Sequence, residues 1–214
     1  MKIKICGITS EKEATYLNKT NVDYAGFVFY KKSKRNIPLD KASEIMKSLN
    51  DRIKTVSVMV SPKREEFLEK EKAGFDIIQI HGNIDEEILD IAKTPIWLAI
   101  NFTDEGYTKK ISWLKALDKG KQDRITGIVV DSKNFGSGEA FDWNKNGDKL
   151  KDEMIKERDF ILAGGLNAEN VREAIKILSP DIVDVSSGVE MDKDKIGKDE
   201  KLIKEFVDKA RLSE

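Results

Sequence analysis

Short runs of apolar, often β-branched residues recur along the whole chain, and longer polar segments separate them. Each run has about 4–8 residues, the usual length of a β-strand, and several are apolar almost throughout. Strands that are covered on both faces, as in a parallel sheet, have this character. We therefore predict eight strands, in the segments IKICGIT, YAGFVF, TVSVMV, DIIQIHG, PIWLAINF, GIVVDS, FILAGGL and DIVDVSSG.

The polar segments between these runs predict helices. Ser10 precedes EKEA, Ser61 stands before Pro62, and Asn167 precedes AENVREAI, which are typical helix starts because such side chains cap free N–H groups. The clearest predicted helices cover residues 40–49, 63–72, 85–92, 168–178 and 199–212.

Alternating strands and helices indicate βαβ units with right-handed crossovers. Eight units in 214 residues predict a (β/α)₈ TIM barrel at the small end of its size range, in one domain over residues 1–214. The competing fold, an open doubly wound sheet, usually has fewer strands. The glycine-containing stretch DSKNFGSGEAFDW follows a strand, so we interpret it as an active-site loop and not as a domain boundary.

Charge and composition exclude several classes of function. The 38 basic and 39 acidic residues leave a net charge of −1, so no overall field favours nucleic acid or an acidic membrane surface. One cysteine cannot form an internal disulfide, and no apolar stretch approaches the roughly 20 residues that span a bilayer. The N-terminus has no signal-peptide pattern, so we expect a cytoplasmic protein without nucleic-acid or membrane partners.

Reactive side chains fall at the predicted carboxyl ends of the strands, where TIM barrels carry their active sites. Cys6 ends the first strand, the only histidine, His81, ends the fourth, Asp131 the sixth and Asp184 lies in the eighth. The first three have a structural alternative: the thiol as buried filler, His81 as a satisfied turn residue and Asp131 as a turn cap. A thiol and a carboxyl group facing each other across a barrel mouth would instead form an acid–base pair.

Two loops have the composition of a phosphate site. The loops after strands seven and eight often hold phosphate in barrels through backbone N–H groups, and glycine lets the backbone approach a ligand closely. The alternative is that these residues only make tight turns. The candidates in LAGGLNAEN and DVSSG are Gly164, Gly165, Ser187 and Gly188.

Two basic residues complete the candidates. Arg35, in the loop KKSKRN, belongs either to a solvated basic loop or to a binding site for a carboxylate, which a guanidinium fits well. Lys4 alternates with Ile3 and Ile5, so it shares the inward face of its strand with Cys6. A buried lysine needs a partner, and we predict an ion pair between Lys4 and Asp184, because strands one and eight are neighbours in a closed barrel.

The segments KICGIT, GFVF with SKRNI, QIHG, GSGEAFDW, LAGGLNAENV and DVSSGVE together resemble the phosphoribosylanthranilate isomerase family of tryptophan biosynthesis, from the first strand to the last. The resemblance implies an Amadori rearrangement of N-(5-phosphoribosyl)anthranilate to 1-(2-carboxyphenylamino)-1-deoxyribulose 5-phosphate. It implies a small-molecule phosphosugar substrate, no cofactor, no metal, and a monomer or a homodimer.

The same resemblance implies a role for each candidate. Asp131 would protonate the furanose ring oxygen as the general acid, and Cys6 would take the C2 proton as the general base. Arg35 would hold the anthranilate carboxylate, and His81 and Asp184 would line the site. The phosphate would be held by Gly164, Gly165, Ser187 and Gly188. A thiol has an ordinary pKa of about 8.5, so we expect a nearby positive charge, such as that of the substrate iminium, to lower the pKa of Cys6.

The chain departs from the family pattern in two loops. Phe135 replaces a usual glycine, Glu139 stands where a lysine is common, and MDKDKIGKD after the last strand is longer and more charged. Two other functions fit the same fold. A histidine-pathway isomerase would use two aspartates and duplicated half-barrels, whereas this chain has no internal repeat and has Cys6 at the base position. A phosphate-ligand binder would need no catalytic groups.

Overall fold

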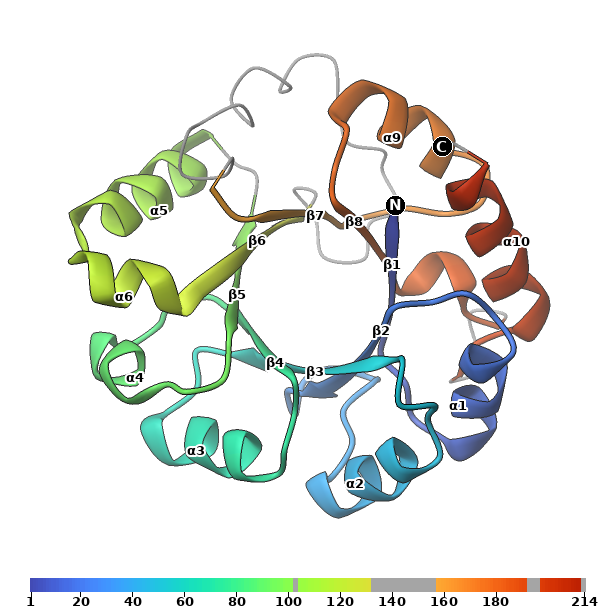
Figure 1. Cartoon of the computed structure of the whole chain (residues 1–214), viewed down its shortest axis with the longest axis horizontal. Coiled ribbons are helices and arrows are strands. Elements are labelled where there is room, and N and C mark those ends of the chain that lie inside the picture. The colour runs from blue at the N-terminus through green and yellow to red at the C-terminus, as the bar shows by residue number, and fades with distance from the viewer. Residues whose placement is uncertain (102–103, 132–156, 192–196, 213–214) are drawn as a thin grey trace.

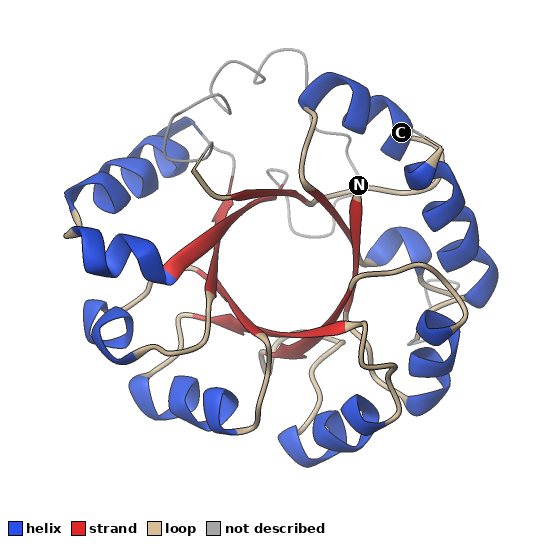
Figure 2. Cartoon of the chain, viewed as in Figure 1, coloured by secondary structure: helices blue, strands red, loops and turns tan. Residues whose placement is uncertain are grey.

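A ring of parallel strands forms the centre of the molecule, and helices surround it (Figures 1 and 2). The computed structural model of the chain describes residues 1–101, 104–131, 157–191 and 197–212. Within these residues, eight strands pair in sequence order and the first pairs with the last, which closes the ring. This confirms the predicted (β/α)₈ TIM barrel.

All eight predicted strands are present, with bounds close to the predicted ones. They are β1 Lys2–Cys6, β2 Tyr24–Phe29, β3 Lys54–Val60, β4 Ile77–His81, β5 Ile96–Asn101, β6 Ile125–Asp131, β7 Asp159–Leu162 and β8 Ile182–Val185. The helices are α1 Glu11–Asn18, α2 Leu39–Lys47, α3 Arg64–Lys72, α4 Glu86–Ile91, α5 Asp104–Ala116, α6 Lys119–Arg124, α9 Val171–Leu178 and α10 Glu200–Arg211, with the short 3₁₀ helix η2 Ser187–Val189.

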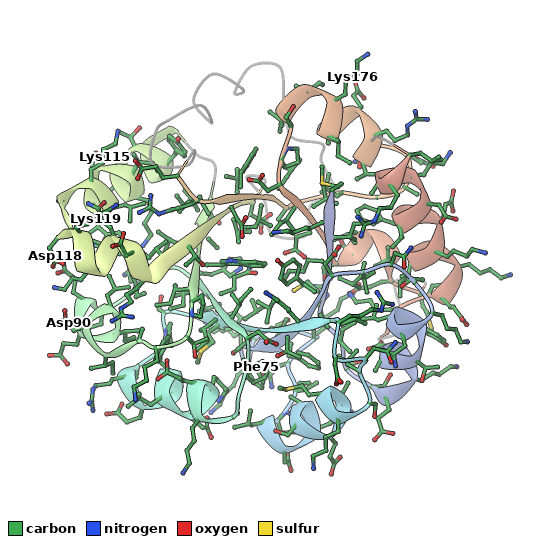
Figure 3. All side chains as sticks on the ribbon, viewed as in Figure 1. Phe75, Asp90, Lys115, Asp118, Lys119 and Lys176 are labelled. Carbon is green, nitrogen blue, oxygen red and sulfur yellow. The ribbon has the colours of Figure 1, made fainter. Side chains whose placement is uncertain are left out.

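The strands separate two apolar layers, because successive side chains point to opposite faces. The larger layer lies between the sheet and the helices. The smaller layer fills the interior of the ring, which is occupied by side chains (Figure 3). It contains Cys6, Tyr24, Val28, Val56, Val58, Ile77, Trp97, Ala99, Val129, Ile161, Ala163 and Ile182.

Trp97 is the largest side chain in the interior, and a glycine makes room for it. A Cβ added to Gly127 on the neighbouring strand would lie 2.5 Å from the Trp97 ring. Tyr24 contacts the same ring edge to face, with 5.0 Å between ring centroids. The interior of the barrel is therefore a packed core. We look for the site at the carboxyl ends of the strands, where TIM barrels carry their active sites.

One of the three predicted helix caps is confirmed, and two need correction. Ser10 caps α1 and forms a capping box with Glu13. Ser61 does not cap α3, which begins after Lys63; its hydroxyl instead accepts from the Asn83 N–H at 2.9 Å. Asn167 stabilises a turn before α9, whose N-cap is Asn170. Among the described helices, none is long and apolar enough to cross a membrane.

Candidate active site

The free thiol of Cys6 lies buried at the carboxyl end of β1, on the inward face of the barrel. On the neighbouring strand, Gly26 stands opposite Cys6 in the register. A Cβ at Gly26 would lie 3.0 Å from the Cys6 Sγ and 3.2 Å from the Lys4 Cε. The absence of a side chain on β2 therefore leaves space for both the thiol and the stem of the lysine.

The predicted ion pair below the thiol is confirmed. Lys4 is fully buried, and its Nζ lies 2.6 Å from the Asp184 Oδ2. Strands β1 and β8 place these two residues directly opposite each other. The second carboxylate oxygen of Asp184, Oδ1, is buried and accepts no hydrogen bond from the described residues, so it has lone pairs available for a ligand.

The expectation that the pKa of Cys6 is lowered is wrong for the free protein. Burial raises the pKa of the thiol, because the thiolate loses its hydration. The charges of Lys4 and Lys198 lower this pKa and the charge of Asp184 raises it, and together they do not offset the burial. The sequence predicted that Lys4 and Asp184 lie near the thiol, but it predicted neither Lys198 nor how deeply the thiol lies.

A second buried lysine, Lys198, lies close enough to the thiol for its charge to act on it. Its Nζ donates to the backbone oxygen of Ser186 at 3.0 Å and forms an ion pair with Glu190 at 3.2 Å. The Ser186 hydroxyl donates to the backbone oxygen of Cys6 at 2.9 Å. Burial lowers the pKa of Lys198, although Glu190 opposes this effect. These contacts connect the end of β1 to the segment between β8 and α10.

Glu190 also holds Arg35, the predicted carboxylate-binding residue. The Arg35 Nε donates to Glu190 at 2.5 Å, and the Lys34 Nζ lies 2.8 Å from the other oxygen of the same carboxylate. Although burial acts in the opposite direction, these cations and Lys198 lower the pKa of Glu190 to about 2. Gly7 has a φ of 82°, and a Cβ there would collide with the Arg35 Cδ. The arginine side chain therefore crosses the residue that directly follows Cys6.

His81 is buried in the barrel and is neutral at pH 7. Burial, reinforced by the charge of Lys4, lowers its pKa to about 4. The His81 Nε2 lies 2.8 Å from the Nε2 of Gln79, which is an amide nitrogen and can only donate. The ring nitrogen therefore accepts this hydrogen bond, and His81 lies near Lys4 as a neutral group.

Asp131 ends β6, opposite Asn101 of β5 in the register. Its position two residues after Val129, which belongs to the interior layer, places Asp131 on the inward face of the barrel. The side chain is partly exposed. Cys6 and Asp131 are thus on the same face and at the same end of the barrel, from strands on different sides of the ring.

The loops after β7 and β8 contact each other, as predicted. Gly164 and Gly165 have φ values of 87° and 68°, which favour glycine. A Cβ on Gly188 would collide with the backbone oxygen of Leu166, so this glycine permits close contact between the two loops. Ser187 begins η2 and is exposed. Turn geometry explains these glycines, and their use as a phosphate site stays a prediction.

Comparisons with known proteins identify the family. The family model for N-(5'-phosphoribosyl)anthranilate (PRA) isomerase matches residues 3–209. The chain belongs to this isomerase family. Its relatives include N-(5'-phosphoribosyl)anthranilate isomerase of Thermoanaerobacter pseudethanolicus, which is 38% identical over 217 residues, covering 99% of this chain and 98% of that protein. That of Clostridium acetobutylicum is 38% identical over 220 residues, with the same coverage.

Solved isomerase structures have the same fold. Phosphoribosyl anthranilate isomerase from Thermotoga maritima matches with a TM-score of 0.84 and 32% identity over 99% of both chains. A phosphoribosyl anthranilate isomerase in complex with reduced 1-(o-carboxyphenylamino)-1-deoxyribulose 5-phosphate matches with a TM-score of 0.81 and 31% identity over 99% of both chains.

The isomerase structure brings four of the nine predicted site residues together with Lys4. Cys6, Asp184 and Lys4 form one buried group, and His81 lies close enough for the charge of Lys4 to act on it. The Arg35 side chain packs against Gly7, the residue that directly follows Cys6. The predicted active-site loop after Asp131, with Ser132, Lys133, Phe135, Glu139 and the motif GSGEAFDW, lies outside the described residues.

Sequence reasoning missed Lys198 and Glu190, which contact the segment after β8 and the predicted residue Arg35. Lys198 stands in the charged segment MDKDKIGKDE, where no local pattern distinguishes a buried lysine from the other charged residues. Gly26 was detectable, since strand pairing places it beside Cys6. Among the described residues, no group of three or more His, Cys, Asp or Glu side chains is placed to hold a metal ion.

Proposed function

We propose that Cys6 and Asp131 are the general base and the general acid with which this chain rearranges N-(5'-phosphoribosyl)anthranilate to 1-(2-carboxyphenylamino)-1-deoxyribulose 5-phosphate in tryptophan biosynthesis. One observation carries the proposal. The only thiol of a chain matched to this isomerase family over residues 3–209 lies at the open end of the barrel, beside a buried ammonium group. A thiol needs such a place to act as a base.

The reaction needs one proton donor and one proton acceptor. Asp131 gives its proton to the ring oxygen, the C1–O bond breaks, and the nitrogen lone pair forms a C1=N iminium. The Cys6 thiolate then takes the C2 proton, and the C–H electrons form C1=C2 and neutralise the iminium nitrogen. The enolamine gains a proton at C1 and loses one from the C2 hydroxyl, which gives the ketose.

The remaining predicted residues would bind the substrate. Arg35 would hold the anthranilate carboxylate with its terminal amino groups, since its Nε already binds Glu190. The open oxygen of Asp184 would accept from a ribose hydroxyl, and neutral His81 would line the site without adding charge. Gly164, Gly165, Ser187 and Gly188 would hold the phosphate.

The test is turnover of phosphoribosylanthranilate, followed by the loss of anthranilate fluorescence. We expect Cys6→Ala and Asp131→Asn each to lower kcat by roughly 10²-fold or more, the usual contribution of a general acid or base. Lys70→Met is the control, because Lys70 is a buried lysine on α3, outside the ring. Full activity of Cys6→Ala would refute the assigned base.

We also propose that residues 1–214 form one catalytic domain that works without a cofactor. One of the matched Thermotoga maritima structures is of monomers generated from a dimeric isomerase, with a TM-score of 0.80 and 32% identity over 99% of both chains. For this chain, a monomer and a homodimer are both predicted states, and sedimentation velocity of the full chain distinguishes them.

A further inference from the structure

Lys4 is a charged side chain that the proposed reaction does not use. It is fully buried at the centre of the molecule, where an ammonium group is costly unless it is paired. The pair with Asp184 accounts for the burial of the charge. It does not explain why a charged pair occupies this place below Cys6. Two apolar side chains of the same volume would pack there as well as Lys4 and Asp184 do.

The geometry connects Lys4 to the thiol as well as to the carboxylate. Lys4 and Cys6 point to the same face of β1, two residues apart. The Cys6 Sγ and the Lys4 Cε border the same small gap over Gly26. The charge of Lys4 lowers the pKa of the thiol, while the 2.6 Å contact joins the ammonium group to Asp184. One ammonium group therefore serves both partners.

We propose that Lys4 is a positioning residue that provides the counter-charge for the Cys6 thiolate, and that Asp184 limits the strength of this counter-charge. This inference rests on the proposed role of Cys6 as the base. It names the source of the positive charge that a buried thiolate requires, and it places this source in the protein and not only in the substrate iminium.

The other charges around the thiol are consistent with this role. Asp184 on β8 and Lys198 before α10 also act on Cys6, while β2 contributes only Gly26 at this level. Asp184 raises the pKa of the thiol, Lys198 lowers it, and Lys4 lowers it the most. His81, on β4, lies near Lys4. Its pKa is lowered to about 4, so the imidazole is neutral at higher pH. Lys198 pairs with Glu190, whose carboxylate also pairs with Lys34 and Arg35.

Lys4 differs from Lys198 in the pH range over which it stays charged. Although burial lowers the pKa of Lys4, Asp184 and then Cys6 raise it by more, so the net pKa is raised. Burial lowers the pKa of Lys198. Lys4 therefore keeps its charge to a higher pH than an ordinary lysine does, whereas Lys198 loses its charge at a lower pH.

The experiment measures the thiol directly and does not depend on turnover. The intact chain is treated with iodoacetamide between pH 6 and pH 11, and mass spectrometry follows the alkylation rate. The chain has one cysteine, so the rate reports Cys6 alone. The variants are Lys4→Met, the double variant Lys4→Met with Asp184→Asn, and Lys70→Met as a control that loses a buried lysine on α3.

We expect the thiol pKa to rise by about one unit or more in Lys4→Met, about tenfold less thiolate at a given lower pH. The double variant should lie between Lys4→Met and the unchanged chain, because the opposing charge of Asp184 is also removed. Lys70→Met should match the unchanged chain. This order supports the proposal. Equal thiol pKa values in all four proteins would overturn it, as would a double variant at or below the unchanged chain.

Kinetics separate this inference from the proposed function. If both hold, the acidic limb of the kcat profile of Lys4→Met moves to higher pH by the same amount as the thiol pKa. A shifted thiol pKa with an unshifted kcat profile would refute Cys6 as the base and keep Lys4 as its counter-charge. Should Lys4→Met not fold, the double variant still tests the order, because it leaves no buried charge unpaired.

Discussion

At the scale of single residues, the site depends on a side chain that is missing. Gly26 on β2 leaves a gap that the Cys6 thiol and the Lys4 stem border. In a densely packed interior such a gap cannot take an added methyl group unless neighbouring atoms move. The free volume beside the thiol is thus set by a strand that contributes no chemistry.

Gly26→Ala should therefore impair the reaction as well as the packing. The added Cβ would lie 3.0 Å from the Sγ and 3.1 Å from the Cα of Cys6, so the thiol must move. We expect a loss of about 1–3 kcal/mol in the free energy of unfolding, typical of overpacking, and at least tenfold lower kcat. Urea unfolding and turnover measure both quantities.

Gly120→Ala is the control for this change. Gly120 lies in the exposed helix α6, where alanine is about 1 kcal/mol more favourable than glycine. We expect it to be neutral or stabilising, with kcat unchanged. If Gly26→Ala retained full kcat, the gap would have no part in positioning the thiol.

The sequence predicted the Lys4–Asp184 pair because strand alternation and barrel closure are both regular. It did not predict the direction of the Cys6 pKa shift, because burial depends on the whole fold. It also did not predict that Glu190 holds Arg35 before any substrate is bound. Such a contact joins the loop after β2 to the residue that follows η2, and no local pattern specifies it.

At the scale of elements, the start of α1 connects two loops of the site. Glu13 closes the capping box with Ser10 and accepts from the Thr9 N–H at 2.5 Å. Its other oxygen accepts from the Lys198 N–H at 2.8 Å, next to Gly197 with its φ of 132°. One buried carboxylate thus connects the loop after β1 to the segment that carries Lys198.

Glu13→Gln should cost more than a cap substitution normally does. An amide presents an N–H where one of these two backbone donors needs an acceptor, so one buried donor loses its partner. We expect a loss of about 1–3 kcal/mol in unfolding free energy, measured in urea. Glu66→Gln is the matched control at the same position of α3, because Glu66 is exposed and caps only its own helix.

The expected loss for Glu66→Gln is below about 1 kcal/mol. Equal losses in the two variants would mean that the contact with Lys198 adds nothing. The capping box could be predicted from the sequence, because Ser10 and Glu13 are three residues apart. The contact with Lys198 was not, since it joins positions 185 apart in the chain.

Element type was more predictable than element boundary. All eight strands follow from apolar runs, because a strand between two packed layers has little room for polar residues. Helix starts depend on single hydrogen bonds. Ser61 fits the cap pattern, yet it has a φ of 44° and pairs with the loop after β4.

At the scale of the whole molecule, the titration of buried groups makes stability depend on pH. The pKa of His81 falls from 6.5 to about 4 on folding, so between these values the unfolded chain binds more protons than the folded one. Stability therefore rises with pH through this window and is lost as the pH falls through it. Glu190, with its pKa of about 2, adds a separate loss below its ordinary value of 4.5.

His81→Gln should remove the first window. For the unchanged chain, we expect the free energy of unfolding to fall by about 3 kcal/mol more than in the variant between pH 6.5 and pH 4. Urea unfolding at half-unit pH steps measures this difference. The chain has one histidine, so no other imidazole contributes. Parallel curves for the two proteins over this range would show that His81 titrates normally in the fold.

The barrel topology was predictable because eight alternating strand–helix units nearly determine it. A cytoplasmic location and the absence of nucleic-acid partners stay predictions. The loop after β6, which is predicted to complete the site over Asp131, lies outside the described residues.

The Lys4–Asp184 contact joins residues 180 positions apart, across the seam where β1 meets β8. During synthesis, Lys4 and Cys6 leave the ribosome long before Asp184 and Lys198. Until the last strand docks, the lysine lacks its carboxylate partner and the thiol stays open to water. We therefore expect the environment of the thiol to form when the ring closes. During refolding, a fall in the alkylation rate of Cys6 would then report the final step of folding.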